Sequence, residues 1–599
     1  MSSFSQDDDQ SNQAHDEEPV FDGATEAPRT NPLADTFDAA MQHFAGGGSG
    51  LAPLNEVIDF CTELYLDSLD PSDPPESKVL EKQLLSIVNG VCRAENSKTK
   101  IATEKLPTSR VLTHWQVAQI MLRCHRVIRL AFPGSKLLGA LATYAAADGP
   151  DRGTYVLDED ELRSLARKYN TQLTLRGFEE VKAILKESAP RVPPCQDRDL
   201  IGVNNGILNY KTKVLMDFDP SIVLLAKIRV DYVDSPINPV IRRDDGTTWD
   251  IESWMKSLSD DPQRVDLGWH GLGAACRPNV RWNKALLPYN ETGNNGKGTY
   301  MSLMRNLVGA DAWGTLSIAD FEDKFRLPKI VGKTAFGADE NNVGAFTDKM
   351  ANFKAVITGD SVTIERKHQD PYDYMANGLV VQCLNSLPKS KDISQSYYRR
   401  LLFWKFDKSF EGREDKAIKD DYLARREVLE YVLWKVMNLP DYYELPVPES
   451  SKAVLAEFKK NNDLVREFWD EIEEELAWDL LPQSFLHDLF DAWAARTNPR
   501  GGGLKRLEFY NRLKQIVAED GRWEDGQFGT SNLMDQPEPL IADYDLTWWM
   551  HPAYAGSAGV NQHGTSRIRK CKPVLKPKYR GLRRVMQPST ASATTTKED

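Results

Sequence analysis

The stretch ALLPYNETGNNGKGTYMSLMRN, residues 285–306, decides the fold. Its apolar start, residues 285–289, predicts a buried strand, and a turn rich in Gly and Asn follows. A helix is expected from about Lys297 onward, through Met301 and Leu303. Strand, glycine-rich loop and helix in this order form the context of a phosphate-binding loop. The stretch therefore predicts an α/β core that binds a nucleotide.

The residue types in this loop suit phosphate binding. Glycines let backbone N–H groups turn toward phosphate oxygens, the helix N-terminus adds a favourable dipole, and a lysine supplies a cation. The expected ATP-binding residues are Gly293, Asn294, Asn295, Gly296, Lys297, Gly298 and Thr299. Glu291 replaces the first glycine of G-x-x-x-x-G-K-[ST], and Gly298 stands where a hydroxyl is usual. Thr299 supplies that hydroxyl one residue late; the alternative is a turn that caps an ordinary helix.

Two strand ends downstream carry polar residues suited to hydrolysis. Asp339 and Glu340 end the apolar run in KIVGKTAFGADENN, where one acid would organise magnesium and the other would polarise water. Asn385 ends the run 379–384, where an amide would orient water against the γ-phosphate. The alternatives are a solvated acidic pair and an Asn that only opens a turn.

Two basic groups complete the pattern. Arg399 and Arg400 precede an apolar strand and are candidates for an arginine finger; a structural pair is the alternative. A β-hairpin is expected within residues 349–378, from the β-type run SVTIERKH and the following Asp370-Pro371, with Arg366, Lys367 and His368 at or near its tip. An exposed basic tip is a candidate contact for nucleic-acid phosphates, and a solvated turn is the alternative.

The order of these signals resembles the superfamily-3 helicases of viruses, phages and plasmids, and more narrowly the phage and poxvirus-type primase–helicases. The segment 204–232, NNGILNYKTKVLMDFDPSIVLLAKIRVDY, is similar to the region before the helicase in those proteins. The resemblance implies that Lys297 is the Walker A lysine and that Asp339 and Glu340 are the Walker B acids. It implies further that Asn385 is the sensor asparagine and that Arg399 or Arg400 is the finger.

The expected fold class is α/β, with a P-loop AAA+-like ATPase core, a helix-rich N-terminal region and a small winged-helix-like C-terminal module. The expected divisions are a disordered acidic leader (1–50), a helix-rich region ending in a short β segment (51–245), the ATPase domain (246–440), the helical module (441–545) and a basic flexible tail (546–599). No cysteine-based zinc site and no convincing metal-binding acidic motif occurs in 51–200, so primase activity is not expected.

Charge is distributed unevenly along the 599 residues, although the net charge is -13. Residues 1–50 hold ten acids and one base, whereas residues 567–584 hold nine Lys and Arg and no acid. A basic segment beside the C-terminal module suits a nucleic-acid contact. The seven scattered cysteines, the lack of a signal peptide and the lack of a long apolar run favour a cytoplasmic protein without a membrane partner.

Together these features predict a ring-shaped, homo-hexameric DNA helicase that uses ATP and Mg²⁺. Its expected partners are single-stranded and forked DNA, further copies of itself and other replication proteins. Two alternatives remain open. One is a replication initiator or loader that uses ATP as a switch and binds duplex DNA, and the other is a P-loop phosphotransferase.

Overall fold

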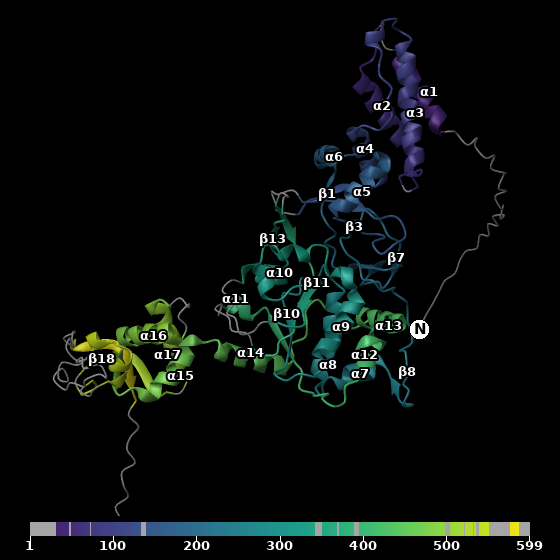
Figure 1. The fold of residues 1–599 in the computed structure, drawn as a ribbon. Helices are drawn as coiled ribbons and strands as arrows, with labels where there is room; N and C mark the ends of the chain where they lie inside the picture. The colour runs from purple at the N-terminus through teal and green to yellow at the C-terminus, as the bar shows by residue number, and fades with distance from the viewer. Residues whose placement is uncertain are drawn as a thin grey trace, which may run out of the picture. The chain divides into compact units, whose positions relative to one another are not determined.

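The structure is a computed structural model. It describes residues 32–46, 50–71, 73–132, 139–341, 350–367, 371–387, 394–497, 504–519, 521–530, 532–534, 538–549 and 576–585. The chain divides into two units, the first comprising the described residues up to 131 together with 140–193, and the second comprising the rest. Figure 1 shows the order of the elements. The division after residue 193 replaces the boundary expected at residue 245.

The first unit joins a helical core to a small sheet. Its helices are α1 Pro32–Ala45, α2 Leu54–Asp67, α3 Ser77–Asn96, α4 His114–Cys124, α5 Glu159–Tyr169 and α6 Leu175–Ser188. Its strands are β1 Ile128–Leu130, β2 Leu141–Tyr144, β3 Tyr155–Val156 and β4 Arg191–Val192, in the sheet order β3-β2-β1-β4. The region is rich in helix, as expected, but this sheet is not evident from the sequence because its strands are only two to four residues long.

Helix α1 corrects part of the expected leader. Ala40 is fully buried and Phe44 is 8% exposed, and both join the core formed by α2 and α3. Apolar side chains at Phe37, Ala40, Met41 and Phe44 recur at helical spacing and cover α3, so residues 32–45 bury enough surface to fold. Residues 1–31 lie outside the described residues.

The second unit begins with short β elements. They are β5 Leu200–Val203, β6 Gly206–Asn209 and β7 Leu215–Met216, followed by β8 Ile241–Arg242 and β9 Thr248–Trp249. Ile201, Leu208 and Ile228 are buried in the same hydrophobic core as the central sheet. Residues 194–245 therefore fold with the predicted ATPase region and not with the helices before them.

A five-stranded parallel sheet forms the centre of the second unit. Its order is β11-β12-β15-β10-β16, from β10 Ala285–Tyr289, β11 Trp313–Thr315, β12 Ala335–Ala338, β15 Leu379–Gln382 and β16 Leu401–Lys405. Alternate residues of β16 face opposite sides: Trp404 packs in the core of α8, α9 and α13, whereas Phe403 contacts Phe458 of α14 at 5.4 Å between ring centroids. Figure 1 shows α9 and α13 on one side of β10, with α10 and α14 on the other.

The helices of this part have the following bounds: α7 Ile251–Ser257, α8 Pro262–Ala275, α9 Lys297–Val308, α10 Ala351–Thr358, α11 Gln395–Tyr398, α12 Lys416–Asp420, α13 Arg426–Met437 and α14 Glu449–Asn461. The predicted hairpin is present as β13 Ser361–Ile364 and β14 Tyr372–Met375, paired antiparallel. Helix α14 lay in the expected C-terminal module, but it packs on β16, where Ser451 Oγ donates to the carbonyl of Phe403.

The C-terminal part has its own core. Its elements follow in the order α15 Leu464–Ile472, β17 Leu480–Pro482, α16 Gln483–Thr497, α17 Arg506–Val517, β18 Trp523–Gly529, α18 Pro539–Asp543 and β19 Lys578–Arg584. The sheet is antiparallel in the order β17-β19-β18. Strand β19 corrects part of the expected flexible tail: Leu582 is fully buried, and Arg583 and Arg584 form ion pairs with Glu524 and Asp479.

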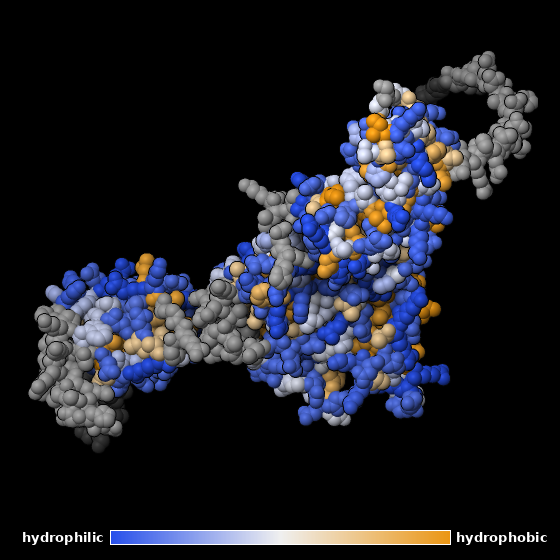
Figure 2. Space-filling model, turned by 45° about the horizontal axis from the view of Figure 1, so that its top comes forward, coloured by the Kyte–Doolittle hydropathy of each residue, from blue (hydrophilic) through white to orange (hydrophobic). Residues whose placement is uncertain are grey.

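The surface is mainly hydrophilic on the face drawn in Figure 2, where hydrophobic side chains lie singly or in small groups. Among the described helices, none combines the length and the apolar character that a membrane span requires.

Candidate nucleotide site

The loop between β10 and α9 makes a sharp turn at the carboxyl end of a fully buried strand. Asn294 and Gly296 adopt positive φ angles of 49° and 90°. Asn tolerates this region, whereas a side chain at Gly296 would place its Cβ 2.9 Å from Leu258. A Cβ at Gly293 or Gly298 would meet open space. Leu258 therefore packs against the loop at Gly296, whereas the loop is open at Gly293 and Gly298. A phosphate-binding loop needs such an open face for its ligand.

Lys297 is the first residue of α9, and it is only 6% exposed. Its Nζ donates to the carbonyl oxygen of Asn290 at 3.1 Å, across the mouth of the loop. Burial lowers the pKa of Lys297, and the nearby Cys383 thiol acts in the opposite direction. Among the described residues its Nζ has this one neutral acceptor, and such a cation can exchange the acceptor for a phosphate oxygen.

Asparagine side chains fix the shape of the loop. Asn290 Oδ1 accepts from the N–H of Thr292 at 2.6 Å and from its hydroxyl at 2.9 Å, while Nδ2 donates to the carbonyl of Phe406. Asn295 is 3% exposed, and its amide donates to the carbonyl of Thr292. Sequence reasoning missed Asn290. Its position directly after the strand could have identified it, because an Asn at the end of a strand often forms an Asx-turn with the residue two positions on.

Asp339 and Glu340 follow β12 directly, at the same sheet edge as the loop. An Nη of Arg305 lies 3.5 Å from a carboxylate oxygen of Asp339, and both side chains are partly exposed. Glu340 is exposed, and its side chain makes no hydrogen bond or ion pair within the part of the chain that the structure describes. Sequence reasoning also missed Arg305, which comes from the third turn of α9.

Cys383 lies close to both Asp339 and Lys297 at this edge of the sheet. Burial raises the pKa of this thiol to about 12, the Asp339 carboxylate raises it as well, and Lys297 acts to lower it. Both charged side chains therefore lie within electrostatic reach of one buried sulfur at the end of β15. The strand order β12-β15-β10 produces this arrangement.

Asn385 belongs to the same edge. Leu384 pairs with Tyr289 in a parallel bridge, and the N–H of Asn290 donates to the carbonyl of Leu384 at 3.2 Å. Asn385 follows at once, with an exposed side chain. Three neighbouring parallel strands thus bring Lys297, the Asp339–Glu340 pair and Asn385 to one edge of the sheet, the carboxyl edge where ligands of open α/β sheets bind.

Arg399 and Arg400 lie elsewhere. They precede β16, and the N–H of Ala285 donates to the carbonyl of Arg400 at 2.7 Å, at the start of β10. Because β10 and β16 are parallel, the pair lies at the opposite end of these strands from Lys297, about 15 Å along five residues. Arg399 has an exposed side chain, whereas Arg400 is half-buried and donates to the carbonyl of Ser396.

The hairpin carries its basic residues beyond the last pair, Ile364 with Tyr372. Arg366 is half-buried and Lys367 is exposed; His368 lies outside the described residues. Lys324 pairs with Glu365 at 3.4 Å and so brings a neighbouring loop to the hairpin. In that loop Phe325 is 69% exposed, between Lys324 and Arg326. The base of the hairpin lies at the amino edge of the five-stranded sheet. There Gly359 lies close to Arg281, which precedes the first residue of β10.

A cleft of about 360 Å³ adjoins the loop. Asn294, Gly296 and Thr299 form one wall of this cleft. The remaining walls come from the turn between β8 and β9, from β9, from α7 with its two flanking residues, and from the segment 410–418: Arg243, Thr248, Trp249, Asp250, Ser253, Trp254, Ser257, Leu258, Phe410, Arg413, Glu414, Asp415 and Ile418. Its size falls in the range of small-molecule sites.

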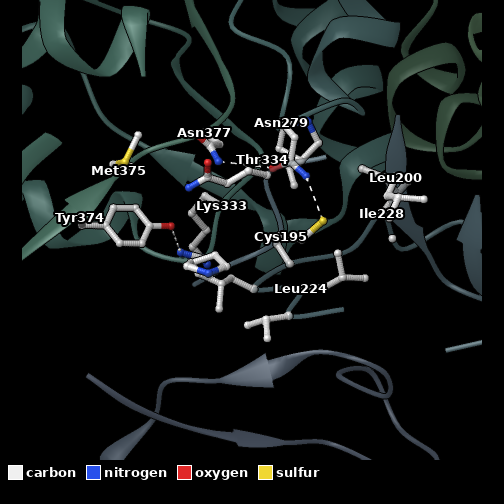
Figure 3. Close-up of a pocket in the computed structure, with 18 of the residues that line it drawn as sticks. Cys195, Leu200, Leu224, Ile228, Asn279, Lys333, Thr334, Tyr374, Met375 and Asn377 are labelled. Carbon is white, nitrogen blue, oxygen red and sulfur yellow. Dashed lines mark hydrogen bonds between the residues drawn. The ribbon is translucent and has the colours of Figure 1, made fainter. Parts of the chain in front are cut away.

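A second, smaller cavity lies at the amino edge of the sheet (Figure 3). Its volume is about 60 Å³, which is room for a few water molecules. Several polar groups of the lining bond to one another or to the backbone: Asn377 donates to Asn279, Asn279 donates to Cys195, and Tyr374 accepts from the N–H of Gly332. Burial also raises the pKa of Cys195, which keeps it protonated. Lys333 also lines this cavity, and its Nζ donates to the carbonyl of Asp311. The small volume of the cavity, and not a lack of charge, therefore argues against a nucleotide site.

Comparisons with known proteins match parts of the chain. Residues 289–400 match a family described as a family of unknown function (DUF5906), and residues 460–543 match the family "Poxvirus D5 protein-like". The first match contains the loop and every predicted catalytic residue, and the second contains α15 to α18 up to residue 543. The second match supports the D5-type relation that the sequence predicts. No curated protein matches the chain.

Solved structures of the NrS-1 C-terminal region also align with the chain. The A-form apo structure has 13% identity, covers 70% of this chain and 97% of its own, and gives a TM-score of 0.38. The apo structure of residues 305–718 of that protein has 12% identity, the same coverage and a TM-score of 0.37. At this identity and TM-score, the alignments show neither a family nor an activity for this chain.

Proposed function

We propose that this protein is an ATP-dependent DNA helicase of replication that translocates on single-stranded DNA. One observation carries the proposal: the loop of Lys297, the acids Asp339 and Glu340, and Asn385 meet at the carboxyl edge of one parallel sheet. The D5-like sequence at 460–543 supports a role in replication. ATP, the magnesium ion, the superfamily-3 assignment and the hexameric ring are parts of this proposal.

The chemistry would be hydrolysis of the γ-phosphate. The amides of 293–297 and the ammonium of Lys297 hold the phosphates, and Glu340 accepts a hydrogen bond from the attacking water. Asn385 orients that water from the neighbouring strand. The exposed position of Glu340 and its lack of a partner among the described residues leave its carboxylate available for this contact.

The oxygen donors present fit magnesium. Asp339 and the hydroxyl of Thr299 would hold it, and when bound it neutralises charge on the β- and γ-phosphates. Within the described residues no group of three or more His, Cys, Asp or Glu side chains forms a metal cage. Mg²⁺ does not need such a cage, because it is usually held by one or two carboxylates, substrate phosphates and water.

The arginine finger would act between subunits. Arg399 and Arg400 lie at the opposite edge from Lys297, so neither reaches the loop of its own chain. A finger acting on the neighbouring subunit's nucleotide requires a ring or another oligomer. Of the two, Arg399 is the better candidate, because its side chain is exposed while Arg400 is bound to the backbone of α11.

Single-stranded DNA would contact the hairpin and the neighbouring loop. Arg366 and Lys367 offer cations to phosphates, and Phe325 offers an exposed ring between two further basic residues. Basic side chains beside an aromatic ring are the usual elements of single-strand binding. His368 remains part of the proposed contact from the sequence alone. We do not assign primer synthesis to the chain.

A second function is favoured by the C-terminal part. Its order of helix, strand, two helices, strand, the short helix α18 and a last strand, with a three-stranded antiparallel sheet, is compatible with the predicted winged-helix-like module, apart from the inserted α18. Such a module could bind duplex DNA while ATP acts as a switch for assembly. This initiator or loader would show little unwinding. A phosphotransferase, the third possibility, would transfer phosphate to a substrate without any response to DNA.

One set of assays separates the three. ATP hydrolysis is measured with and without single-stranded DNA, alongside displacement of a strand from forked duplex. The helicase predicts stimulated hydrolysis and unwinding, both lost in Lys297→Ala by at least about 10²-fold. The initiator predicts binding without displacement. Unstimulated hydrolysis without unwinding would exclude the helicase.

A further inference from the structure

We propose that Asn341 is a positioning residue for the proposed hydrolysis. Its side-chain amide fixes the turn that carries Asp339 and Glu340, and it links this turn to the segment that leads to the hairpin. Asn341 follows the two acids directly and is half-buried. This inference rests on the proposed function, since the acids that Asn341 holds are the residues proposed to act on magnesium and water.

Backbone hydrogen bonds hold the end of β12 on both sides. The N–H of Cys383, just after β15, donates to the carbonyl of Ala338 at 3.0 Å. The N–H of Leu316, just after β11, donates to the carbonyl of Gly337 at 3.2 Å. The two acids follow at once, and their side chains are exposed. The turn therefore needs a further fixed point if its carboxylates are to keep one geometry.

The amide of Asn341 supplies this point by continuing the pairing on both sides. Its Nδ2 donates to the carbonyl oxygen of Cys383 at 3.0 Å, and its Oδ1 accepts from the N–H of Ile318 at 2.9 Å. An amide side chain offers the same kinds of donor and acceptor as a peptide group, so it can replace the next peptide of the strand. Because Asn385 lies two residues after Cys383, the first bond also fixes the acids relative to the proposed sensor residue.

A buried glutamine holds the two partners of Asn341 to each other. Gln382 of β15 is fully buried, and its Nε2 donates to the carbonyl of Leu316 at 3.0 Å. Since β12 lies between β11 and β15 in the sheet, this side chain crosses the end of β12. Asn341 therefore binds two segments whose separation is already set, and the position of its own turn is determined from both sides.

The segment that accepts Asn341 continues into the proposed DNA contact. Glu322, four residues after Ile318, accepts from the backbone N–H groups of residues 352–353 at 2.8 and 3.2 Å, at the start of α10. Helix α10 leads into β13 of the hairpin, and Phe325 follows Glu322 by three residues. The bond between Asn341 and Ile318 therefore lies on a continuous path of contacts from the acids to the hairpin. Such a path couples two sites only if both bias it, so the response to DNA has to be measured.

The test measures steady-state ATP hydrolysis by the full chain with and without single-stranded DNA, and the binding of ADP with Mg²⁺ by calorimetric titration. We expect Asn341→Ala to lower kcat about ten- to a hundredfold, because a displacement of about 1 Å costs that much in rate. The dissociation constant for ADP should stay within about threefold of wild type, since the loop that binds the phosphates is intact. The stimulation by DNA should decrease as well.

Asn341→Asp separates the two hydrogen bonds. This variant keeps the acceptor for Ile318 but loses the donor to Cys383 while its carboxyl is ionised. Protonation restores one O–H donor, and the neighbouring acids raise the pKa of this carboxyl. We therefore expect kcat of Asn341→Asp, relative to wild type at the same pH, to rise as the pH falls. A ratio that does not change with pH would show that the bond to Cys383 plays no part.

Asn205→Ala is the matched control. The Asn205 amide donates to the carbonyl of Tyr232 at 3.1 Å and accepts from its N–H at 2.9 Å. The control therefore loses the same pair of side-chain bonds to backbone, at the turn between β5 and β6. It should leave kcat and the stimulation by DNA at the wild-type level.

The outcomes distinguish the two proposals. If Asn341→Ala keeps the wild-type kcat, or if it loses ADP binding together with kcat, Asn341 does not position the acids. If kcat falls but the stimulation by DNA keeps its wild-type ratio, the link from Ile318 to the hairpin is wrong. If wild-type protein does not hydrolyse ATP, or if Lys297→Ala retains hydrolysis, the proposed nucleotide site itself is wrong.

Discussion

Lys297 has a proposed role in phosphate binding, but burying its ammonium lowers the free energy of unfolding. Its ammonium is buried, so its pKa in the folded protein is lower than in the unfolded chain. The unfolded state therefore binds more protons than the folded state between the folded pKa and about 10.5, and stability rises with pH across that window. The cost of burying the charge is fully present below the folded pKa and is lost as the pH rises through it.

Replacing this lysine should stabilise the protein. We expect Lys297→Met to raise Tm at pH 7 by a few degrees, and the gain over wild type should shrink as the pH approaches about 10. Thermal melts at several pH values measure this. A variant with a lower Tm at pH 7, or a gain that grows with pH, would show that the ammonium is stabilised by its surroundings.

Arg305 forms an ion pair with the carboxylate of Asp339. Its guanidinium is 3.5 Å from the carboxylate and stacks 5.5 Å from the Trp313 ring, so it competes with a metal ion for Asp339. We expect Arg305→Met to lower the dissociation constant for Mn²⁺ without nucleotide about two- to fivefold, because partly exposed pairs are weak. Paramagnetic titration measures it. Weaker Mn²⁺ binding in the variant would mean that Arg305 instead orients the carboxylate.

At the scale of elements, the hairpin β13–β14, the proposed DNA contact, is separate from the proposed nucleotide site. Its base lies at the amino edge of the sheet and the loop lies at the carboxyl edge. Lys367→Ala should therefore leave ATP affinity unchanged and reduce stimulation by single-stranded DNA severalfold, with a shallower dependence on salt. The exposed Lys100→Ala, in the first unit, serves as the control. Loss of ATP binding in Lys367→Ala would place the hairpin in the nucleotide site.

Local patterns predicted the elements that bear the site. The apolar runs 285–289 and 379–384 became β10 and β15, and the helix begins at Lys297 as expected. Positions that depend on pairing between distant segments were not predictable. The sequence does not show that β16 runs parallel to β10, and this register is what moves Arg399 and Arg400 away from the loop. The cleft also needs segments from 243 to 418 to meet.

The same limit explains the errors at the two ends. Charge and glycine content suggested a leader without structure, yet four apolar residues at helical spacing are enough to hold α1 against α3. The basic segment near the C-terminus contains β19, whose Leu582 fills the module core while Arg583 pairs with Glu524 of β18 and Arg584 pairs with Asp479 just before β17. Composition averages over such contacts, whereas the structure depends on them.

At the scale of the whole molecule, the proposed finger would make ATP hydrolysis depend on assembly, because the arginines lie at the opposite end of β10 and β16 from Lys297. Subunits with Arg399→Ala and subunits with Lys297→Ala should each be inactive alone, by about 10³-fold for the arginine. Mixed together they should regain part of the activity, because some interfaces then combine an intact loop with an intact finger. Steady-state hydrolysis across mixing ratios measures this. Mixtures as inactive as either parent would exclude Arg399 as a residue that acts in trans.

The central claim is that nucleotide hydrolysis at the Lys297 loop is coupled to single-stranded DNA. The most direct measurement is the steady-state rate of ATP hydrolysis by the full chain as single-stranded DNA is added, at low and at high salt. We predict a rate that rises severalfold and saturates at low salt, with a DNA requirement that increases steeply as salt rises. A rate that does not change with DNA at either salt concentration would contradict the account.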